Sequence, residues 1–207
     1  MKKLSTEHPF FEFMGNIGDL MILNVLFLIT SIPVVTIGMS MTVMYKIILR
    51  RMRGESCYVI REYFRECGNE WRQSTKLWGL FVVTGGLLLF DILYSKNLPG
   101  ALNIAIGILA VLWCFVAIYA FPLQARFHNS IKNTLKNALL LSLQNLPATL
   151  IMVLLNSIPV ICIVAGVFVT MIAMPIFCVI GFSLTARING IFLSGIFRKI
   201  ENRENKE

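Results

Sequence analysis

The sequence predicts an all-α fold: a polytopic bundle of transmembrane helices in a single membrane domain over residues 1–207. Hydrophobic residues make up 57% of the chain and charged residues 14%, whereas ordinary globular domains are about 45–50% apolar and about 25% charged. The charges are also segregated, because Asp91 and Lys96 are the only ones in stretch 79–121 and Arg187 is the only one in stretch 138–197. Apolar stretches of this length predict membrane spans, since about 20 helical residues cross a hydrocarbon core of about 30 Å.

The basic residues predict the direction of these spans. The net charge is +8, but the lysines and arginines cluster between apolar stretches, which is typical of topology signals and not of a nucleic-acid surface. Short basic segments mark the cytoplasmic side, so the stretch Ser95–Gly100, with Lys96 alone, is expected outside. The groups expected inside are Lys2 and Lys3, Lys46 to Lys76, Arg126 to Lys136, and Arg198 to Lys206.

The first apolar run is predicted to form a hairpin. It contains the stretch SIPVVTIG, from Ser31 to Gly38, whose proline interrupts a helix and whose serine, threonine and glycine suit a turn. A single kinked span would place Lys2 and the arginine-rich segment on opposite sides of the membrane. A hairpin with its outer corner at Pro33 keeps both inside, so we expect spans at about 12–32 and 35–52.

The remaining apolar stretches complete a prediction of six spans with both termini in the cytoplasm. The letters SIPV recur at Ser157–Val160, where Pro159 is expected to kink one span because a turn there would leave too little chain on one side. Pro147 is expected near the inner interface, after a short interfacial turn. The four further spans are expected at about 71–94, 101–124, 146–169 and 174–196.

A short amphipathic helix is predicted at residues 56–68, between the second and third spans. Ile60, Tyr63 and Phe64 follow the i, i+3, i+4 pattern of one helical face, and Gly68 is expected to end the helix. We expect this helix to lie flat on the cytoplasmic membrane surface. The alternative is that the same three side chains dock on a partner protein.

Charged residues inside spans are costly and therefore mark candidate sites. Asp19 and Arg187 are expected at similar depths, about 21 and 22 Å from the nearest outer turn at the helical rise. An opposite charge offsets much of the desolvation of each, so we expect the two to pair. Asn24 and Asn189 are expected to complete this intramembrane polar site.

Signals for catalysis or for a cofactor are absent from the sequence. It has two histidines, no CxxC pair, and none of the HExxH, GxSxG, Walker A or dinucleotide-binding patterns. We therefore expect no catalytic residue, no cofactor and no metal site, and hence a protein that is not an enzyme.

Four segments carry a family resemblance: GNIGDLMILNVLFLITSIPVVTIG, RGESCYVIREYFREC, YAFPLQARF and NALLLSLQNLP. Together they resemble the YesL family of bacterial membrane proteins, a domain of unknown function. The most specific part is the pattern N-x6-S-x-P-V-x-T-x-G from Asn24 to Gly38. The positions that carry the resemblance are Asn24, Pro33, Thr36, Gly38, Pro122 and Arg126.

This resemblance implies a multi-pass protein of the bacterial plasma membrane, similar to permease-like components encoded beside carbohydrate ABC importers. It supplies no catalytic residue. We therefore expect a non-enzymatic accessory component whose partners are the lipid bilayer and subunits of an ABC sugar transporter, with its oligomeric state left open. The alternative is a small secondary transporter with an intramembrane site around Asp19 and Arg187.

Overall fold

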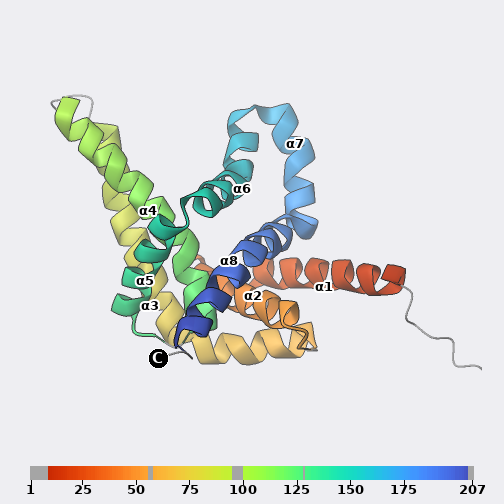
Figure 1. Ribbon diagram of the computed structural model, residues 1–207. Helices are drawn as coiled ribbons and strands as arrows, with labels where there is room; N and C mark the ends of the chain where they lie inside the picture. Colours follow the sequence, from red (N-terminus) through yellow and green to blue (C-terminus); the bar gives the residue numbers. More distant parts are fainter. Residues whose placement is uncertain (1–8, 56–57, 95–99, 128, 205–207) are drawn as a thin grey trace, which may run out of the picture.

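The structure, a computed structural model, describes residues 9–55, 58–94, 100–127 and 129–204. The regular elements in these ranges are all helical, so the predicted all-α fold is confirmed (Figure 1). The elements η1 and η3 are a 3₁₀ turn and a π-helical segment, and α7, η3 and α8 follow one another without a break. The elements are α1 (Pro9–Thr30), η1 (Val34–Thr36), α2 (Ile37–Met52), α3 (Val59–Tyr94), α4 (Gly100–Arg126), α5 (Ile131–Gln144), α6 (Leu146–Val164), α7 (Val167–Ile176), η3 (Phe177–Gly181) and α8 (Phe182–Glu204).

Within the described residues, four helical segments are long and apolar enough to cross a membrane: Val59–Tyr94, Gly100–Arg126, Leu146–Val164 and Val167–Glu201. The first two predicted spans coincide with α1, which has 22 residues, and α2, which has 16. The 16 residues of α2 extend about 24 Å. A helix of that length falls short of a hydrocarbon core of about 30 Å. The fold is therefore that of a membrane protein in which α3, α4, α6 and α7–α8 are the candidate spans.

Two helical hairpins project from a common base (Figure 1). One hairpin consists of α3 and α4, and the other of α6 and α7. We define the base as α2, α5, α8, residues 59–78 of α3 and residues 115–126 of α4. In the base, α2 is surrounded by other helices and buried along most of its length. Apolar side chains at the far ends of the hairpins are exposed, including Leu93 at 71% and Val164 at 81%, as expected for contact with lipid.

The chain turns at Pro33, as the sequence predicts. Helix α1 ends at Thr30, Pro33 precedes η1, and α2 begins at Ile37. The side chain of Thr36 closes the turn, because its Oγ1 donates a hydrogen bond of 2.6 Å to the carbonyl oxygen of Pro33 and another to that of Thr30. The stretch SIPVVTIG is therefore a corner between two helices and not a kink within one.

The corner at Pro33 lies against residues of α3. The Oγ1 atom of Thr30 is 2.7 Å from Oη of Tyr63, and Nε1 of Trp78 donates a hydrogen bond of 2.8 Å to the carbonyl oxygen of Val34. Tyr63 belongs to the segment predicted at the cytoplasmic surface, and the two membrane surfaces are about 30 Å apart. An outer corner at Pro33 and an inner helix at 56–68 therefore cannot both hold, so the two predictions exclude each other in this structure.

The predicted amphipathic helix is not a separate element. Residues 59–68 form the first turns of α3, and the helix continues through Gly68 to Tyr94. Figure 1 shows these first turns lying across the bottom of the molecule before α3 turns up toward α4. The expected helix start at residues 56 and 57, and most of the expected outer loop at 95–100, lie outside the described residues.

The turn between the last two spans also differs from the prediction. The sequence suggests a turn near residues 169–174, but α6 ends at Val164 and α7 begins at Val167. Gly166 makes this turn with a φ of +117°, which a glycine adopts at little cost because it has no Cβ. Pro159 lies inside α6, as predicted, and Pro147 lies in its first turn.

The close approach of α2 to α3 gives a first prediction. A Cβ atom on Gly38 would lie 2.4 Å from Cβ of Trp78 and 2.8 Å from the carbonyl oxygen of Ser74. Because the second atom is backbone, the two helices must separate, so Gly38→Ala should lower the free energy of unfolding by about 1–3 kcal/mol. Thermal unfolding of the detergent-solubilised protein measures this change.

Gly18→Ala on α1 is the matched control for this experiment. A Cβ atom there meets nothing within 4 Å, and alanine favours a helix over glycine by about 0.5–1 kcal/mol. Its unfolding midpoint should therefore be equal to or above that of the wild type. Equal midpoints for Gly38→Ala and the wild type would contradict the close packing of α2 on α3.

Candidate functional site

Three clusters of polar side chains join the described helices around the base. The first is a ladder of ion pairs between α2 and α3. The second is an amide junction between α1 and η3, and the third is an arginine-lined cavity where α2, α4 and α8 end. Each cluster joins at least two elements, so together they help to fix the arrangement of the base and of the helices around it.

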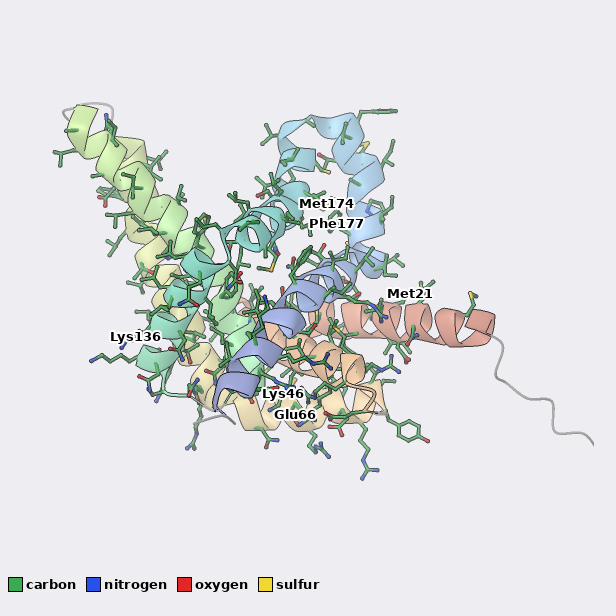
Figure 2. The ribbon with its side chains drawn as sticks, in the orientation of Figure 1. Met21, Lys46, Glu66, Lys136, Met174 and Phe177 are labelled. Atoms are coloured by element: carbon green, nitrogen blue, oxygen red, sulfur yellow. The ribbon has the colours of Figure 1, made fainter. Side chains whose placement is uncertain are left out.

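The ion-pair ladder is built from residues at four-residue spacing on two antiparallel helices. Lys46 and Arg50 lie on α2, while Glu62, Glu66 and Glu70 lie on α3, and residues four apart share a helical face. The Nζ atom of Lys46 is 2.7 Å from Oε2 of Glu66 and 2.6 Å from Oε1 of Glu70. Figure 2 shows Lys46 and Glu66 side by side in the base. One ammonium group therefore bridges two carboxylates.

A second rung continues the ladder toward the end of α2. Nη1 of Arg50 is 3.0 Å from Oε1 of Glu66 and 3.4 Å from Oε2 of Glu62. The side chains of Lys46 and Glu66 are only 10% and 4% exposed. Buried charges of this kind are tolerated only when they are paired, because the desolvation cost is several kcal/mol per ion. The ladder is therefore satisfied internally and leaves little free charge for a ligand.

Burial and ion pairing act in opposite directions on the pKa of Glu66, which lies in the part of α3 that precedes the apolar segment. Burial raises the pKa of its carboxyl group, but the hydrogen bond and the charge of Lys46 lower it. Asn69 and Arg50 add to the lowering, and the net pKa lies below the ordinary value. Glu66 is therefore ionised at neutral pH, and its contribution to stability is present above the ordinary carboxyl pKa and lost as the pH falls toward the lowered value.

Sequence reasoning missed the ladder. The alternation of Arg and Glu at residues 61–66 indicates a solvated face, and Lys46 and Arg50 at the end of an apolar run indicate side chains that extend to the interface. The signal that could have found the ladder is the matching spacing of the two sets. Glutamates recur every four residues from 62 to 70, and the two basic residues are also four apart.

The amide junction gives a structural role to the family-signature residue Asn24. This side chain is fully buried. Its Nδ2 donates to the carbonyl oxygens of Phe177 at 3.0 Å and Cys178 at 2.7 Å, and its Oδ1 accepts from the backbone N–H of Ser183 at 2.9 Å. Asn24 therefore occupies the place of a peptide group in the irregular backbone of η3. That irregularity follows Pro175, which lacks the N–H of a regular helix.

The predicted pair of Asp19 and Arg187 does not form. Asp19 makes an ion pair with Arg51 instead. All three side chains line one cavity of about 10 Å³, which is about the space of one water molecule. Arg187 therefore lies beside this ion pair without joining it, because Arg51 is the partner that reaches Asp19.

The four predicted site residues therefore separate into three places. Asp19 and Arg187 share the small cavity, and Asn24 lies in the junction with η3. Asn189 is fully buried, and its Nδ2 donates a hydrogen bond of 3.1 Å to Oη of Tyr45 on α2. They do not form one intramembrane pocket.

The three residues of the predicted docking face are also separated, because one of them is buried and two are exposed. Tyr63 is completely buried, and its hydroxyl contacts Thr30. Ile60 and Phe64 are exposed at 54% and 56%, as a docking face requires. Trp71, about two helical turns beyond Phe64, is also exposed. The exposed apolar stripe of α3 is therefore Ile60, Phe64 and Trp71.

The last two signature residues lie at the end of α4. Pro122 is buried inside this helix, one turn before Arg126. The Nε and Nη2 atoms of Arg126 donate to Oε1 of Glu201 on α8, at 3.0 and 2.6 Å. Arg126 and Glu201 both line a cavity of about 530 Å³. Among the described residues no group of three or more His, Cys, Asp or Glu side chains is placed to hold a metal ion.

Comparisons with known proteins agree with the family resemblance. Residues 20–92 match the family model "Protein of unknown function, DUF624". The chain is 30% identical over 109 residues to "Uncharacterized protein YesL" of Bacillus subtilis (strain 168). These matches confirm the resemblance to a YesL-like DUF624 family over part of the chain. The alignment covers 51% of this chain and 51% of YesL, so the chain matches about half the length of that relative. No solved structure matches it.

The segment that matches the DUF624 model begins at residue 20 in α1 and ends at residue 92 near the end of α3. It therefore contains the corner at Pro33, Gly38 and the complete ion-pair ladder. Asn24 is also within the segment, whereas its partners in η3 are outside it. The family model thus matches the part of the chain in which polar contacts fix α1, α2 and α3 to one another.

The ladder gives a second prediction. Lys46→Met leaves Glu66 and Glu70 buried without the cation that they share, so the free energy of unfolding should fall by about 3–5 kcal/mol. Lys76→Met, at an exposed position on α3, removes the same charge and should leave the thermal unfolding midpoint close to that of the wild type.

A triple variant separates the ladder from general charge effects. Lys46→Met/Glu66→Leu/Glu70→Leu removes Lys46 together with both of the carboxylates that it pairs with. Neither Glu66 nor Glu70 is then left buried without its cation. The triple variant should recover much of the stability lost in Lys46→Met, because buried ion pairs can be replaced by apolar residues at little cost. An unchanged midpoint in Lys46→Met would refute a structural role for the ladder.

Proposed function

We propose that this protein is a non-enzymatic accessory component of a carbohydrate ABC transport system in the bacterial plasma membrane. The transport system is suggested by the family resemblance, and the accessory role by the structure of the base. In the proposed role, the hairpins α3–α4 and α6–α7 anchor the protein in lipid. The base contacts the cytoplasmic part of a transporter subunit.

The observation that carries the proposal is the apolar stripe of Ile60, Phe64 and Trp71. These side chains are exposed at 54%, 56% and 46%, although they lie on the part of α3 that carries the ion-pair ladder and not on its apolar end. Arg61 and Arg65 flank the stripe and are exposed. Aromatic side chains and arginine are enriched in protein interfaces, so the stripe suits a partner with an apolar groove and acidic edges.

The alternative of a small secondary transporter has weaker support. The cavity beside Asp19 and Arg187 has a volume of about 10 Å³, whereas pockets for small molecules measure about 300–1,000 Å³. A second cavity, of about 250 Å³, lies between α1, α2, α6 and α8 and includes Tyr45, Asn156 and Pro159. No charged residue lines this second cavity, so it offers no charged side chain that could bind a coupling ion.

We also propose a topology of four spans in place of six. In this arrangement α3, α4, α6 and α7–α8 cross the membrane, and α1 and α2 enter and leave on the cytoplasmic side. The contacts of the corner with Tyr63 and Trp78 support it, and so does the shortness of α2. The number of crossings stays even, so both termini remain on the cytoplasmic side, in agreement with the positive-inside rule.

The docking stripe can be tested by co-purification. The full chain, tagged at one terminus, is purified in mild detergent from bacterial membranes that contain its native partners, and co-purifying proteins are identified by mass spectrometry. The wild type should capture an ABC transporter subunit. The pair Ile60→Ser/Phe64→Ser should reduce that capture at least tenfold, because these anchors supply the apolar contact.

Ile60→Leu/Phe64→Leu is the matched control, since it keeps the stripe apolar and should retain most of the capture. Equal capture by the serine and leucine pairs would rule out the stripe as the docking surface. Capture of proteins other than transporter subunits would contradict the proposed partner.

A further inference from the structure

A large cavity lies where the ends of three helices meet in the base. Its volume is about 530 Å³, which is within the usual range for small-molecule pockets. The ends of α2 and α4 and the last turns of α8 surround it, and all of these lie at the same end of the molecule (Figure 1). The lining residues are Leu49, Met52, Arg53, Arg126, Ser194, Gly195, Phe197, Arg198 and Glu201.

The charge of this lining is unbalanced. Arg53, Arg126 and Arg198 come from three different helical segments, and Glu201 is the single carboxylate among the lining residues. Glu201 pairs with Arg126, and Arg53 pairs with Glu55 outside the cavity. Among the described residues, Arg198 has no carboxylate within ion-pair distance. Like charges gathered in one cavity repel, and a bound anion removes that repulsion.

The apolar part of the lining indicates more than a bare anion. Leu49, Met52 and Phe197 form part of the same wall, so a ligand that fills the cavity has a carbon portion as well as a charged group. Guanidinium groups recognise phosphate through paired, charge-assisted hydrogen bonds. The arginines belong to the sequence groups expected on the cytoplasmic side, where both anionic lipid headgroups and soluble phosphate esters are available.

We propose that this cavity binds a phosphate ester, with Arg53, Arg126 and Arg198 holding the phosphate and Leu49, Met52 and Phe197 contacting its carbon portion. The ester is either the headgroup of an anionic phospholipid or a small soluble phosphate ester. Arg126 keeps its bond to Glu201 and uses its remaining N–H groups, while Arg198 is the principal unpaired cation. This site is separate from the docking stripe on α3 and does not depend on it.

Binding to two probes tests the proposal and identifies the source of the phosphate. The full chain in neutral detergent is titrated with dioctanoyl phosphatidylglycerol, followed by native mass spectrometry, and with glycerol 3-phosphate, followed by calorimetry. The wild type should bind at least one probe. Arg198→Gln should weaken that binding about tenfold or more, the usual effect of losing a charged hydrogen bond, and Arg53→Gln should weaken it in the same direction.

Lys199→Gln is the matched control, because it removes the same charge from the next residue of α8, which does not line the cavity. Its affinity for the probe should equal that of the wild type. Phosphatidylglycerol binding alone identifies a lipid site, and glycerol 3-phosphate binding alone identifies a soluble ligand. Failure of both probes to bind would overturn the proposal, as would equal weakening in Arg198→Gln and Lys199→Gln.

Discussion

The ion pairs that Lys46 forms with Glu66 and Glu70 determine how α2 lies on α3. The three charged side chains are almost completely buried. Any shift of one helix along the other would leave a buried charge without its partner, at a cost of several kcal/mol. The same register brings Gly38 against Trp78 and places the corner at Pro33 beside the first half of α3. The position of the N-terminal helices thus depends on polar contacts within the base.

The α3–α4 hairpin is held together by a different kind of contact in its middle part. Phe81 and Trp113 pack with ring centroids 5.6 Å apart, and a Cβ atom on Gly85 would lie 2.7 Å from Cζ2 of Trp113. Beyond these contacts α3 and α4 expose apolar side chains on most faces, and lipid supplies their environment. The base therefore carries the polar contacts that fix the packing of the helices, whereas the hairpins expose apolar surface.

Much of the fold follows from the sequence, because hydropathy and turn chemistry act locally. The corner at Pro33, the apolar segments and the exposure of Ile60 and Phe64 are all predictable in this way. The ladder, the burial of Tyr63 and the bonds of Asn24 to η3 depend on contacts between distant segments. The Asp19–Arg187 prediction failed for that reason, since it rested on depth along single helices, and Arg51 was the nearer partner.

The location of the corner tests the proposed topology most directly. Single cysteines at Val35 in the corner and Leu93 at the end of α3, both exposed, are introduced in a cysteine-free background. Intact cells are then treated with a membrane-impermeant maleimide. With the corner on the cytoplasmic half of the membrane, the reagent should label Leu93→Cys and leave Val35→Cys unlabelled, while permeabilised cells provide the control for the reactivity of position 35. Labelling of Val35→Cys from outside, at a rate like that of Leu93→Cys, would contradict the four-span arrangement and restore the outer hairpin.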